Sequence, residues 1–296
     1  MPGRADRAPA VSAHRGGHEQ AAAGTYPAYE FALAAGADYL ELDARRTSDG
    51  TLVACHRARA GWGRLDWGRL DWGRLDWGRL DWGRLDWGRA VAGLAYPRLC
   101  RLAGYEVPRL AHVMPLLAGR AGLHLDVKDP GSAAPAAELA LGALGPDDVV
   151  LTTREPAVAR KLARQFPDLQ IGLAVGGDLG ESARFLAGRA ARRGRSRLDP
   201  VLAAGAGWAA LHYRQAAGLA AQCRERGLRT LVWTVNDDRA LARWLGCRDV
   251  DVLVTDRPAR AVAIRDRRAT QAAGPDRAAR PGPSDGRPGP APGRDR

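Results

Sequence analysis

The feature that most constrains the fold is a repeated alternation of short apolar runs with segments of helical periodicity. Runs of four or five residues with the character of buried strands lie at 10–13, 39–42, 52–55, 123–127, 149–152, 171–175, 209–212, 230–234 and 252–255. Helices are expected at 27–35, 156–165, 181–193, 215–226 and 239–245. Such alternation is typical of parallel strands joined by crossover helices. We therefore expect an α/β fold, a (β/α)₈ TIM barrel, in which one of the nine strand candidates is an extra strand or not a strand.

Two segments are not expected to pack into this barrel. The pentapeptide WGRLD occurs five times from Trp62 to Asp86, and a partial copy begins at Trp87. A five-residue period matches neither a helix nor a strand, so we interpret residues 62–89 as a low-complexity loop insertion; a surface that touches lipid headgroups or a partner is the alternative. Residues 265–296 are rich in Pro, Arg and Gly and hold no aliphatic residue larger than Ala. We expect a disordered C-terminal tail there and a barrel domain over residues 1–264.

Charge and hydropathy exclude several classes of protein. The net charge is +12, but the basic residues are spread along the chain rather than gathered on one stripe, so no nucleic-acid partner is expected. No apolar stretch approaches the ~20 residues of a transmembrane span, and the N-terminus lacks the apolar core of a signal peptide. Four cysteines without metal-site spacing fit reduced thiols. We expect a cytoplasmic protein without a transmembrane segment; peripheral contact with a membrane stays open, and so does the oligomeric state.

Polar side chains recur at the C-terminal ends of the first four strand candidates. They are His14, Arg15, Glu41, Asp43, His56, Asp126 and Lys128. In a barrel these strand ends share one rim, where active sites of this fold are built. Side chains two apart on a strand point the same way, so Glu41 and Asp43 are expected to converge with Asp126, flanked by two imidazoles. The other histidines, at positions 18, 112, 124 and 212, fall on a loop, a helix and inside strands, where structural roles are favoured.

Three clustered carboxylates repel one another unless a cation or a proton intervenes. Oxygen ligands select a hard ion, so one divalent cation, Mg²⁺ or Ca²⁺, is the expected cofactor. Two histidines beside such an ion can act as general acid and general base, because imidazole titrates near neutral pH. Arg15 and Lys128 add positive charge that suits a phosphate-containing substrate.

The residues resemble the glycerophosphodiester phosphodiesterase family. The resemblance rests on SAHRGG (12–17), GADYLELDARRTSDGTLVACH (36–56), LHLDVK (123–128), VWTVN (232–236) and VLVTDRP (252–258), in the family's order. It implies a TIM-barrel enzyme that hydrolyses a small glycerophosphodiester to glycerol 3-phosphate and an alcohol with a divalent cation. It also implies the roles of single residues: catalytic His14 and His56, metal ligands Glu41, Asp43 and Asp126, phosphate contacts Arg15 and Lys128, and Trp233 as a rim aromatic near the glycerol side.

The chain departs from the family pattern at several positions. Asp126 stands where the family usually has Glu, Ala23 replaces an acidic residue near the first histidine, and Arg57 replaces the common Asp after His56. Related venom phospholipases D have Asp at the place of Asp126, so a headgroup-cleaving reaction on lysophospholipids is one alternative. A catalytically inactive barrel that binds phosphodiesters or a membrane is the other.

Overall fold

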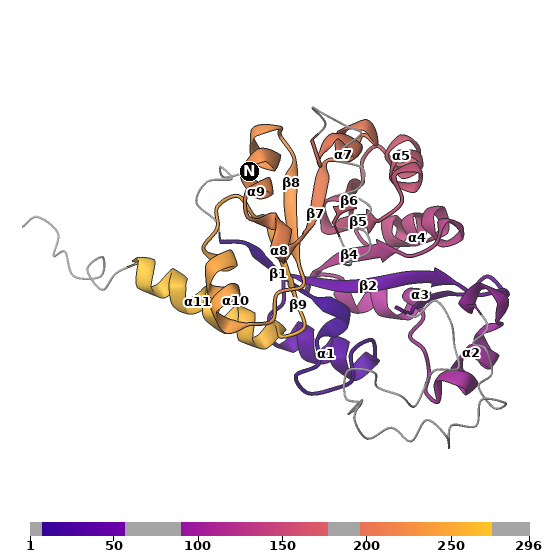
Figure 1. Cartoon of the computed structure of the whole chain (residues 1–296). Coiled ribbons are helices and arrows are strands. Elements are labelled where there is room, and N and C mark those ends of the chain that lie inside the picture. Colours follow the sequence, from indigo (N-terminus) through magenta and orange to yellow (C-terminus); the bar gives the residue numbers. More distant parts are fainter. Residues whose placement is uncertain (1–7, 57–89, 177–195, 274–296) are drawn as a thin grey trace, which may run out of the picture.

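Eight parallel strands form a closed barrel in the computed structural model, which describes residues 8–56, 90–176 and 196–273 (Figure 1). The barrel strands are β1 (Ala10–Ala13), β2 (Tyr39–Arg46), β4 (Gly122–Val127), β5 (Val149–Thr153), β6 (Gln170–Val175), β7 (Trp208–His212), β8 (Arg229–Trp233) and β9 (Val252–Thr255). Each pairs in parallel with its neighbours, and pairing of β1 with both β9 and β2 closes the ring. The predicted TIM barrel is confirmed. The WGRLD array, the predicted helix 181–193 and residues 274–296 lie outside the described residues.

The ninth strand candidate is an extra strand and not part of the ring. β3 (Leu52–Ala54) pairs antiparallel with the C-terminal end of β2, Ala54 opposite Ala44 and Leu52 opposite Arg46. The chain therefore turns after β2 and runs back toward the rim, where the Cys55 N–H donates to the Asp43 carbonyl at 2.8 Å. His56 therefore reaches the rim on a returning antiparallel segment. The strand-end pattern instead predicts a place at the end of a parallel barrel strand.

Helices surround the barrel (Figure 1). They are α1 (Tyr26–Ala34), α2 (Tyr96–Ala103), α3 (Leu110–Val113), α4 (Pro130–Ala143), α5 (Pro156–Gln165), α7 (Asp199–Ala203), α8 (Tyr213–Ala216), α9 (Leu219–Glu225), α10 (Asp238–Leu245) and α11 (Pro258–Ala273). The helix predicted at 215–226 is two helices, because Gly218 adopts φ +105° between α8 and α9. Asp237 caps α10 as the sequence suggests, whereas the Thr25 hydroxyl donates to the Ala22 carbonyl instead of capping α1.

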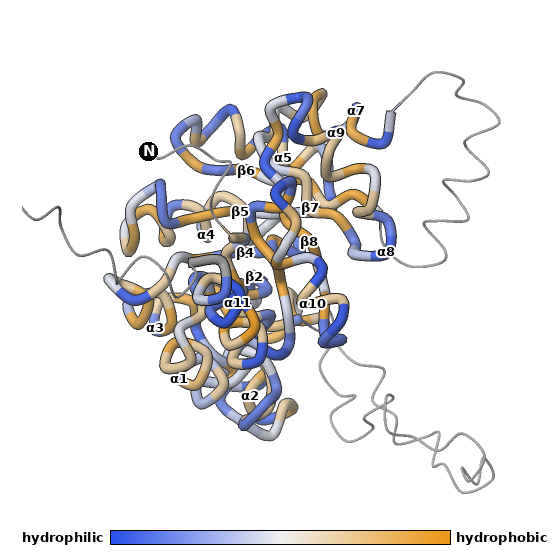
Figure 2. The backbone as a smooth tube through the Cα atoms, turned by 90° about the vertical axis from the view of Figure 1, so that its left-hand side faces the viewer, coloured by the Kyte–Doolittle hydropathy of each residue, from blue (hydrophilic) through white to orange (hydrophobic). Residues whose placement is uncertain are grey.

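Alternate residues of each strand form two separate apolar layers. Val150, Trp208, Leu231 and Val252 belong to a core inside the barrel, while their strand neighbours pack outward beneath the helices. Apolar segments accordingly run through β5 and β7 at the centre of Figure 2. The side chain of Tyr39 fills the space over Gly122, where an added Cβ would lie 2.6 Å from the tyrosine ring. The apolar interior closes one end of the barrel and leaves the polar side chains at the C-terminal end.

The folded part of the chain continues beyond the expected boundary at Ile264. Helix α11 runs to Ala273, and the Arg265 guanidinium pairs with the Asp38 carboxylate at the start of β2. The expectation of disorder from residue 265 is therefore wrong for residues 265–273, because an ion pair and helix-forming Ala and Arg residues extend the last helix. In the described residues, no helix combines the length and the apolar character needed to span a bilayer.

Candidate functional site

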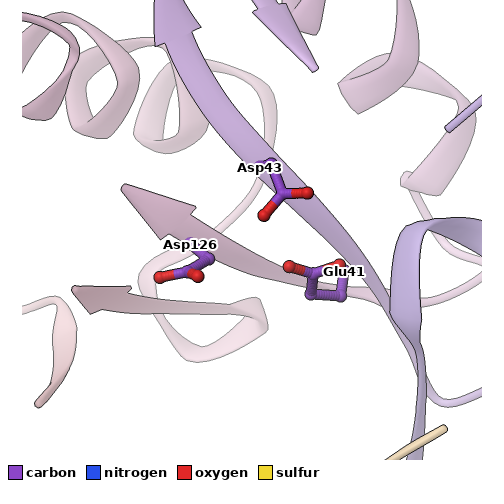
Figure 3. A group of neighbouring side chains, drawn as sticks. All are labelled: Glu41, Asp43 and Asp126. Atoms are coloured by element: carbon purple, nitrogen blue, oxygen red, sulfur yellow. The ribbon is translucent and has the colours of Figure 1, made fainter. Parts of the chain in front are cut away.

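The register of β2 and β4 brings the three predicted carboxylates together. Glu41 and Asp43 are two apart on β2 and both face inward, and Asp43 lies directly opposite Asp126 in the ladder. One oxygen from each of the three lies within 4.8 Å of the others (Figure 3). The predicted convergence is confirmed, and Asp126 reaches the cluster although its side chain is one methylene shorter than a glutamate.

Glu41 and Asp43 are buried and Asp126 is partly buried beside them, and their pKa values reflect this crowding. Burial and the neighbouring Asp43 charge raise the pKa of Glu41 to about 8. Burial also raises the pKa of Asp126, whereas at Asp43 burial is outweighed by the combined effect of Lys128, His56 and His14, which lowers the pKa. Asp43 Oδ2 has no hydrogen-bond donor among the described residues, and the Lys128 ammonium meets Oδ1. A buried oxygen without a donor in an all-carboxylate set fits a hard divalent cation, which would offset the burial and the repulsion that hold a proton on Glu41.

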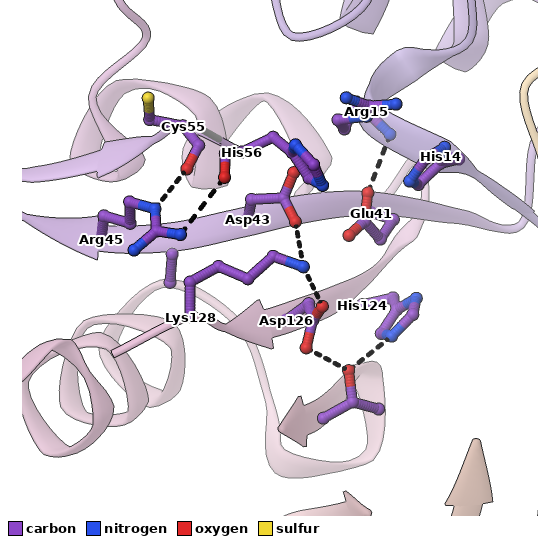
Figure 4. A network of polar contacts seen from close by, with 12 residues as sticks. His14, Arg15, Glu41, Asp43, Arg45, Cys55, His56, His124, Asp126 and Lys128 are labelled. Carbon is purple, nitrogen blue, oxygen red and sulfur yellow. Dashed lines mark hydrogen bonds and ion pairs between the residues drawn. The ribbon is translucent and has the colours of Figure 1, made fainter. Parts of the chain in front are cut away.

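Lys128 lies inside the carboxylate cluster. Its Nζ is 2.8 Å from Asp43 Oδ1 and forms a second ion pair with Asp126 (Figure 4). These partners raise the pKa of the ammonium against the opposing effect of burial, so Lys128 stays charged. The structure thus shows Lys128 as a partner of the predicted metal ligands, with 19% of its side chain still exposed toward the barrel mouth.

His14 follows β1 and is held by a residue that the sequence analysis missed. Its Nδ1–H donates to Asp256 Oδ1 at 2.6 Å, and Asn236 Nδ2 donates to the other oxygen of Asp256 at 2.6 Å. Burial opposes a charged His14, but Glu41 and Asp256 together raise its pKa. The pKa of Asp256 falls to about 2 despite burial, because His14 and Asn236 donate to it. Asp256 supplies the polar support for His14 that the alanine at position 23 does not.

The segment after His14 takes a sharp turn that places a backbone donor on the site. Arg15 has φ +51°, in the left-handed region, and its N–H donates to Glu41 Oε2 at 2.9 Å. Gly16 and Gly17 follow with φ +80°, and an added Cβ on Gly16 would lie 2.7 Å from the backbone of α1. Such backbone conformations concentrate at functional sites, and here the turn aims Arg15 at the predicted metal ligands.

His56 lies beside Asp43 while His14 lies beside Glu41, so the carboxylates stand between the two imidazoles (Figure 4). Arg45 anchors the segment before His56 by donating to the carbonyls of Cys55 and His56 at 3.0 and 3.2 Å. His56 is exposed at the rim, yet partial desolvation and the nearby charges of Arg15 and Lys128 outweigh the effect of Asp43 and lower its pKa to about 4. The two histidines therefore differ in the protonation state that they favour.

A chain of buried hydrogen bonds through Thr152 and His124 supports Asp126. The Thr152 hydroxyl donates to Asp126 Oδ1 at 3.1 Å and so must accept from His124 Nε2 at 3.0 Å. The other nitrogen, Nδ1, then accepts from the Ser12 hydroxyl at 3.4 Å. Burial lowers the pKa of His124 to about 3, which keeps this imidazole neutral. His124 thus has the structural role that its position inside a strand suggests.

Trp233 ends β8 on the far side of the barrel mouth from the carboxylates. The Arg154 guanidinium lies over its ring at 5.3 Å, and the His212 ring meets it edge-on at 5.2 Å. The remaining two histidines lie elsewhere: His112 is exposed in α3, and His18 is exposed after the turn, where its N–H donates to the Asp256 carbonyl. Trp233 is therefore at the predicted rim, accompanied by a cation that the sequence did not single out.

The missed residues differ in whether the sequence holds a signal for them. Asp256 follows β9 and could have been found by the same strand-end rule that identified His14. Thr152 could not, since a threonine inside an apolar strand looks like ordinary sheet composition. Its role becomes visible only through the register of β4 and β5, which sets it opposite Asp126.

One family model matches the chain, that of the Glycerophosphoryl diester phosphodiesterase family, over residues 14–62. The matched segment holds five of the eight predicted site residues: His14, Arg15, Glu41, Asp43 and His56. No curated protein matches the sequence. The match confirms the resemblance that the strand-end motifs predict.

Solved structures of proteins named as phosphodiesterases share the fold. A Silicibacter pomeroyi protein is 23% identical, with a TM-score of 0.69 over 89% of this chain and 95% of its own. A glycerophosphodiester phosphodiesterase from Agrobacterium tumefaciens is 22% identical, with a TM-score of 0.62 over 86% and 99%. An Oleispira antarctica phosphodiesterase, solved in complex with the product sn-glycerol-3-phosphate, is 16% identical, with a TM-score of 0.63 over 88% and 97%. At these identities the likeness shows a common barrel fold that extends over nearly the whole of each relative.

Proposed function

We propose that this chain is a divalent-cation-dependent glycerophosphodiester phosphodiesterase that hydrolyses its substrate to glycerol 3-phosphate and an alcohol. The family match over residues 14–62 and the shared barrel support the reaction class. The observation that carries the proposal is the convergence of Glu41, Asp43 and Asp126 within 4.8 Å, between the imidazoles of His14 and His56.

The carboxylate cluster would hold the cation. Glu41, Asp43 and Asp126 offer only oxygen ligands, and Asp43 Oδ2, which has no donor among the described residues, is open to the cation. A bound Mg²⁺ or Ca²⁺ would polarise a phosphoryl oxygen and offset the charge that develops there. The Arg15 N–H and the Thr152 hydroxyl orient the outer oxygens of the cluster, and Lys128 balances part of its charge.

His14 and His56 are the proton carriers in this proposal. One takes a proton from the attacking water molecule, and the other gives a proton to the oxygen of the leaving alcohol, so that a P–O bond to water forms as the P–O bond to the alcohol breaks. Asp256 binds Nδ1 of His14 and so leaves Nε2 as the nitrogen that exchanges protons with the substrate. This arrangement also fixes the plane of the ring, as a carboxylate does for the histidine of a catalytic triad.

The substrate's phosphate is proposed to lie against Arg15 and Lys128, and its organic part toward Trp233. Positive charge beside the carboxylate cluster favours an anionic phosphodiester, and the half-buried Trp233 offers an apolar face at the mouth. The Oleispira antarctica relative, which has the same fold, binds sn-glycerol-3-phosphate, the product that this proposal names.

Release of glycerol 3-phosphate from glycerophosphocholine tests the proposal, measured with Mg²⁺, with Ca²⁺ and with EDTA. We expect turnover that EDTA abolishes, and a loss of at least about 100-fold in His14→Ala and in His56→Ala. His112→Ala is the matched control, because this histidine is exposed in α3. Cation-independent release, or equal release by the wild type and His14→Ala, would refute the assignment. Release of choline from lysophosphatidylcholine, without turnover of glycerophosphocholine, would instead indicate the headgroup-cleaving reaction.

A further inference from the structure

A cavity of about 340 Å³ opens between α8 and α10, outside the barrel. Three arginines line it: Arg214 from α8, and Arg239 and Arg243 one turn apart on α10. The two helices lie side by side in both Figure 1 and Figure 2. Nothing in the proposed reaction uses these residues.

Among the described residues, the three guanidinium groups have no acidic partner, in contrast to other exposed arginines. Arg224 pairs with Asp249 at 2.8 Å and Arg120 with Glu30 at 3.0 Å. None of the described residues lining the cavity carries a carboxylate, and no ion pair joins its arginines to any described acid.

The two acids that begin α10 are already engaged. Asp237 accepts from the N–H groups of Arg239 and Ala240, both at 3.0 Å, and so caps the helix. Asp238 pairs with Arg257 and Arg260 of the segment around the start of α11. Three like charges therefore face one cavity without compensation from any described acid, an arrangement that an external anion would stabilise.

Aromatic side chains hold two of the arginines in place. The Arg243 guanidinium lies over the ring of buried Trp244 at 5.2 Å. Arg214 lies over the Tyr213 ring at 5.6 Å, and its Nε donates to the Tyr213 hydroxyl at 3.0 Å. Stacking of this kind leaves the outer N–H groups of a guanidinium available and reduces the conformational entropy lost when an anion binds.

The cavity also adjoins the mouth of the barrel. The His212 ring lies 5.0 Å from the Tyr213 ring and 5.2 Å from the Trp233 ring, so aromatic side chains connect the cavity with the predicted substrate side of the rim. An anion in the cavity would thus lie near a molecule bound at Trp233.

We propose that the cavity between α8 and α10 is a phosphate-binding site separate from the carboxylate cluster. Phosphate suits it because a tetrahedral oxyanion can accept from several guanidinium groups at once. Two sources can supply such a group: a second phosphate on the organic part of a soluble substrate, or the headgroup of an anionic lipid.

Titration of the full chain with inorganic phosphate in the presence of EDTA tests the site, with binding followed by calorimetry. We expect the double variant Arg239→Gln/Arg243→Gln to raise the dissociation constant at least about tenfold, which is about 1.4 kcal/mol. The matched control is Arg120→Gln/Arg224→Gln, which removes two arginines that already pair with Glu30 and Asp249. This control should stay within about twofold of the wild type. Equal effects of the two double variants, or no effect of the first, would overturn the proposal, as would the absence of measurable phosphate binding by the wild type.

Two further measurements identify the source of the phosphate. For a lipid headgroup, the wild type should co-sediment with phosphatidylglycerol vesicles and not with phosphatidylcholine vesicles. Co-sedimentation with phosphatidylglycerol should weaken in Arg239→Gln/Arg243→Gln. For a soluble substrate, Arg239→Gln/Arg243→Gln should lower kcat/KM for a glycerophosphodiester that carries a second phosphate. The same variant should leave kcat/KM for glycerophosphoethanolamine unchanged. Only this last measurement rests on the proposed function: an inactive protein that still binds phosphate through these arginines would refute the enzyme and leave the site intact.

Discussion

Replacing Thr152 by valine isolates the support that the buried hydrogen-bond chain gives to Asp126. The two side chains have nearly the same shape, so the change removes the hydroxyl that donates to Asp126 Oδ1 at 3.1 Å without opening a cavity. A hydrogen bond to a charged group contributes about 1.5–3 kcal/mol, which would correspond to about 10- to 150-fold in affinity. Lys128 continues to hold the other oxygen of Asp126, so we expect a loss near the lower limit, about tenfold in the affinity for Mn²⁺.

The same substitution should also destabilise the fold, because His124 Nε2–H loses its acceptor inside the barrel. An unsatisfied buried donor reduces the free energy of unfolding by about 1–3 kcal/mol. Metal affinity is measured by calorimetry at a temperature where the variant is folded, and stability by urea unfolding in EDTA. Thr152→Ser should restore the metal affinity, since it retains the hydroxyl.

Thr230→Val is the matched control for this experiment. Thr230 is buried to the same degree as Thr152, but no described group hydrogen-bonds to its hydroxyl oxygen. The control should therefore bind Mn²⁺ as the wild type does and unfold at an equal or higher urea concentration. If Thr152→Val and Thr230→Val bind Mn²⁺ with the same affinity, the hydrogen-bond chain does not position Asp126, and the reasoning fails.

Three further changes test other parts of the site. Asp256→Asn should lower kcat about 100-fold or more with little effect on KM, because the amide does not stabilise a charged His14; steady-state kinetics check this, and a change confined to KM would contradict it. The raised Glu41 pKa, about 8, means that cation binding displaces a proton, so Mg²⁺ affinity should rise up to about tenfold per pH unit and level off above pH 8. Without metal, the folded state retains the Glu41 proton above pH 4.5 whereas the unfolded chain does not, so the free energy of unfolding should fall as pH rises toward 8. A Mg²⁺ affinity that does not change with pH in calorimetric titrations would refute the first pH prediction, and a free energy of unfolding that does not change with pH in urea would refute the second. Gly16→Ala should destabilise the protein by about 2 kcal/mol more than Gly24→Ala does, because both glycines have φ +80° but only the added Cβ at Gly16 would clash; thermal unfolding of the two variants decides.

The barrel was predictable because its strands are short, apolar and separated by helices. Their limits are largely right, since β1 and β9 agree with the expected ranges and most others differ by one or two residues. The direction of β3 was not predictable from its own residues, as a three-residue apolar run pairs equally well in either sense. β2 extends to Arg46, beyond the ring, and so provides an edge with which the returning segment can pair. This edge sets the direction of β3.

Helix α4 escaped prediction for a different reason. Its sequence is rich in alanine, so apolar residues occur on every side and no 3.6-residue stripe stands out. The structure buries Ala133, Ala136, Ala137 and Ala140 on one face, where small side chains allow close packing on the sheet. Which alanines are buried follows from tertiary contacts and not from the pattern of hydropathy.

The candidate site was predictable where single strand ends carry charged groups, and unpredictable where it depends on contacts between distant segments. His14 and Asp256 are 242 positions apart in the chain and meet only because β1 and β9 are neighbours in the closed ring. The sequence identified both motifs as family signatures, yet no local pattern links an aspartate after β9 to a histidine after β1. The order of the strands in the ring supplies that link.

Lys128 shows how a compositional anomaly acquires a physical reason. Of the 45 basic residues of the chain only Lys128 and Lys161 are lysine. The structure places the ammonium of Lys128 between Asp43 and Asp126, where a compact charge can meet two carboxylates that belong to different strands. A planar guanidinium is larger and binds best to one carboxylate in a bidentate fork, so it would separate the pair and displace the oxygens from the cluster. Because Lys128 neutralises only part of the charge on three carboxylates, the site retains an excess of negative charge that a divalent cation can balance.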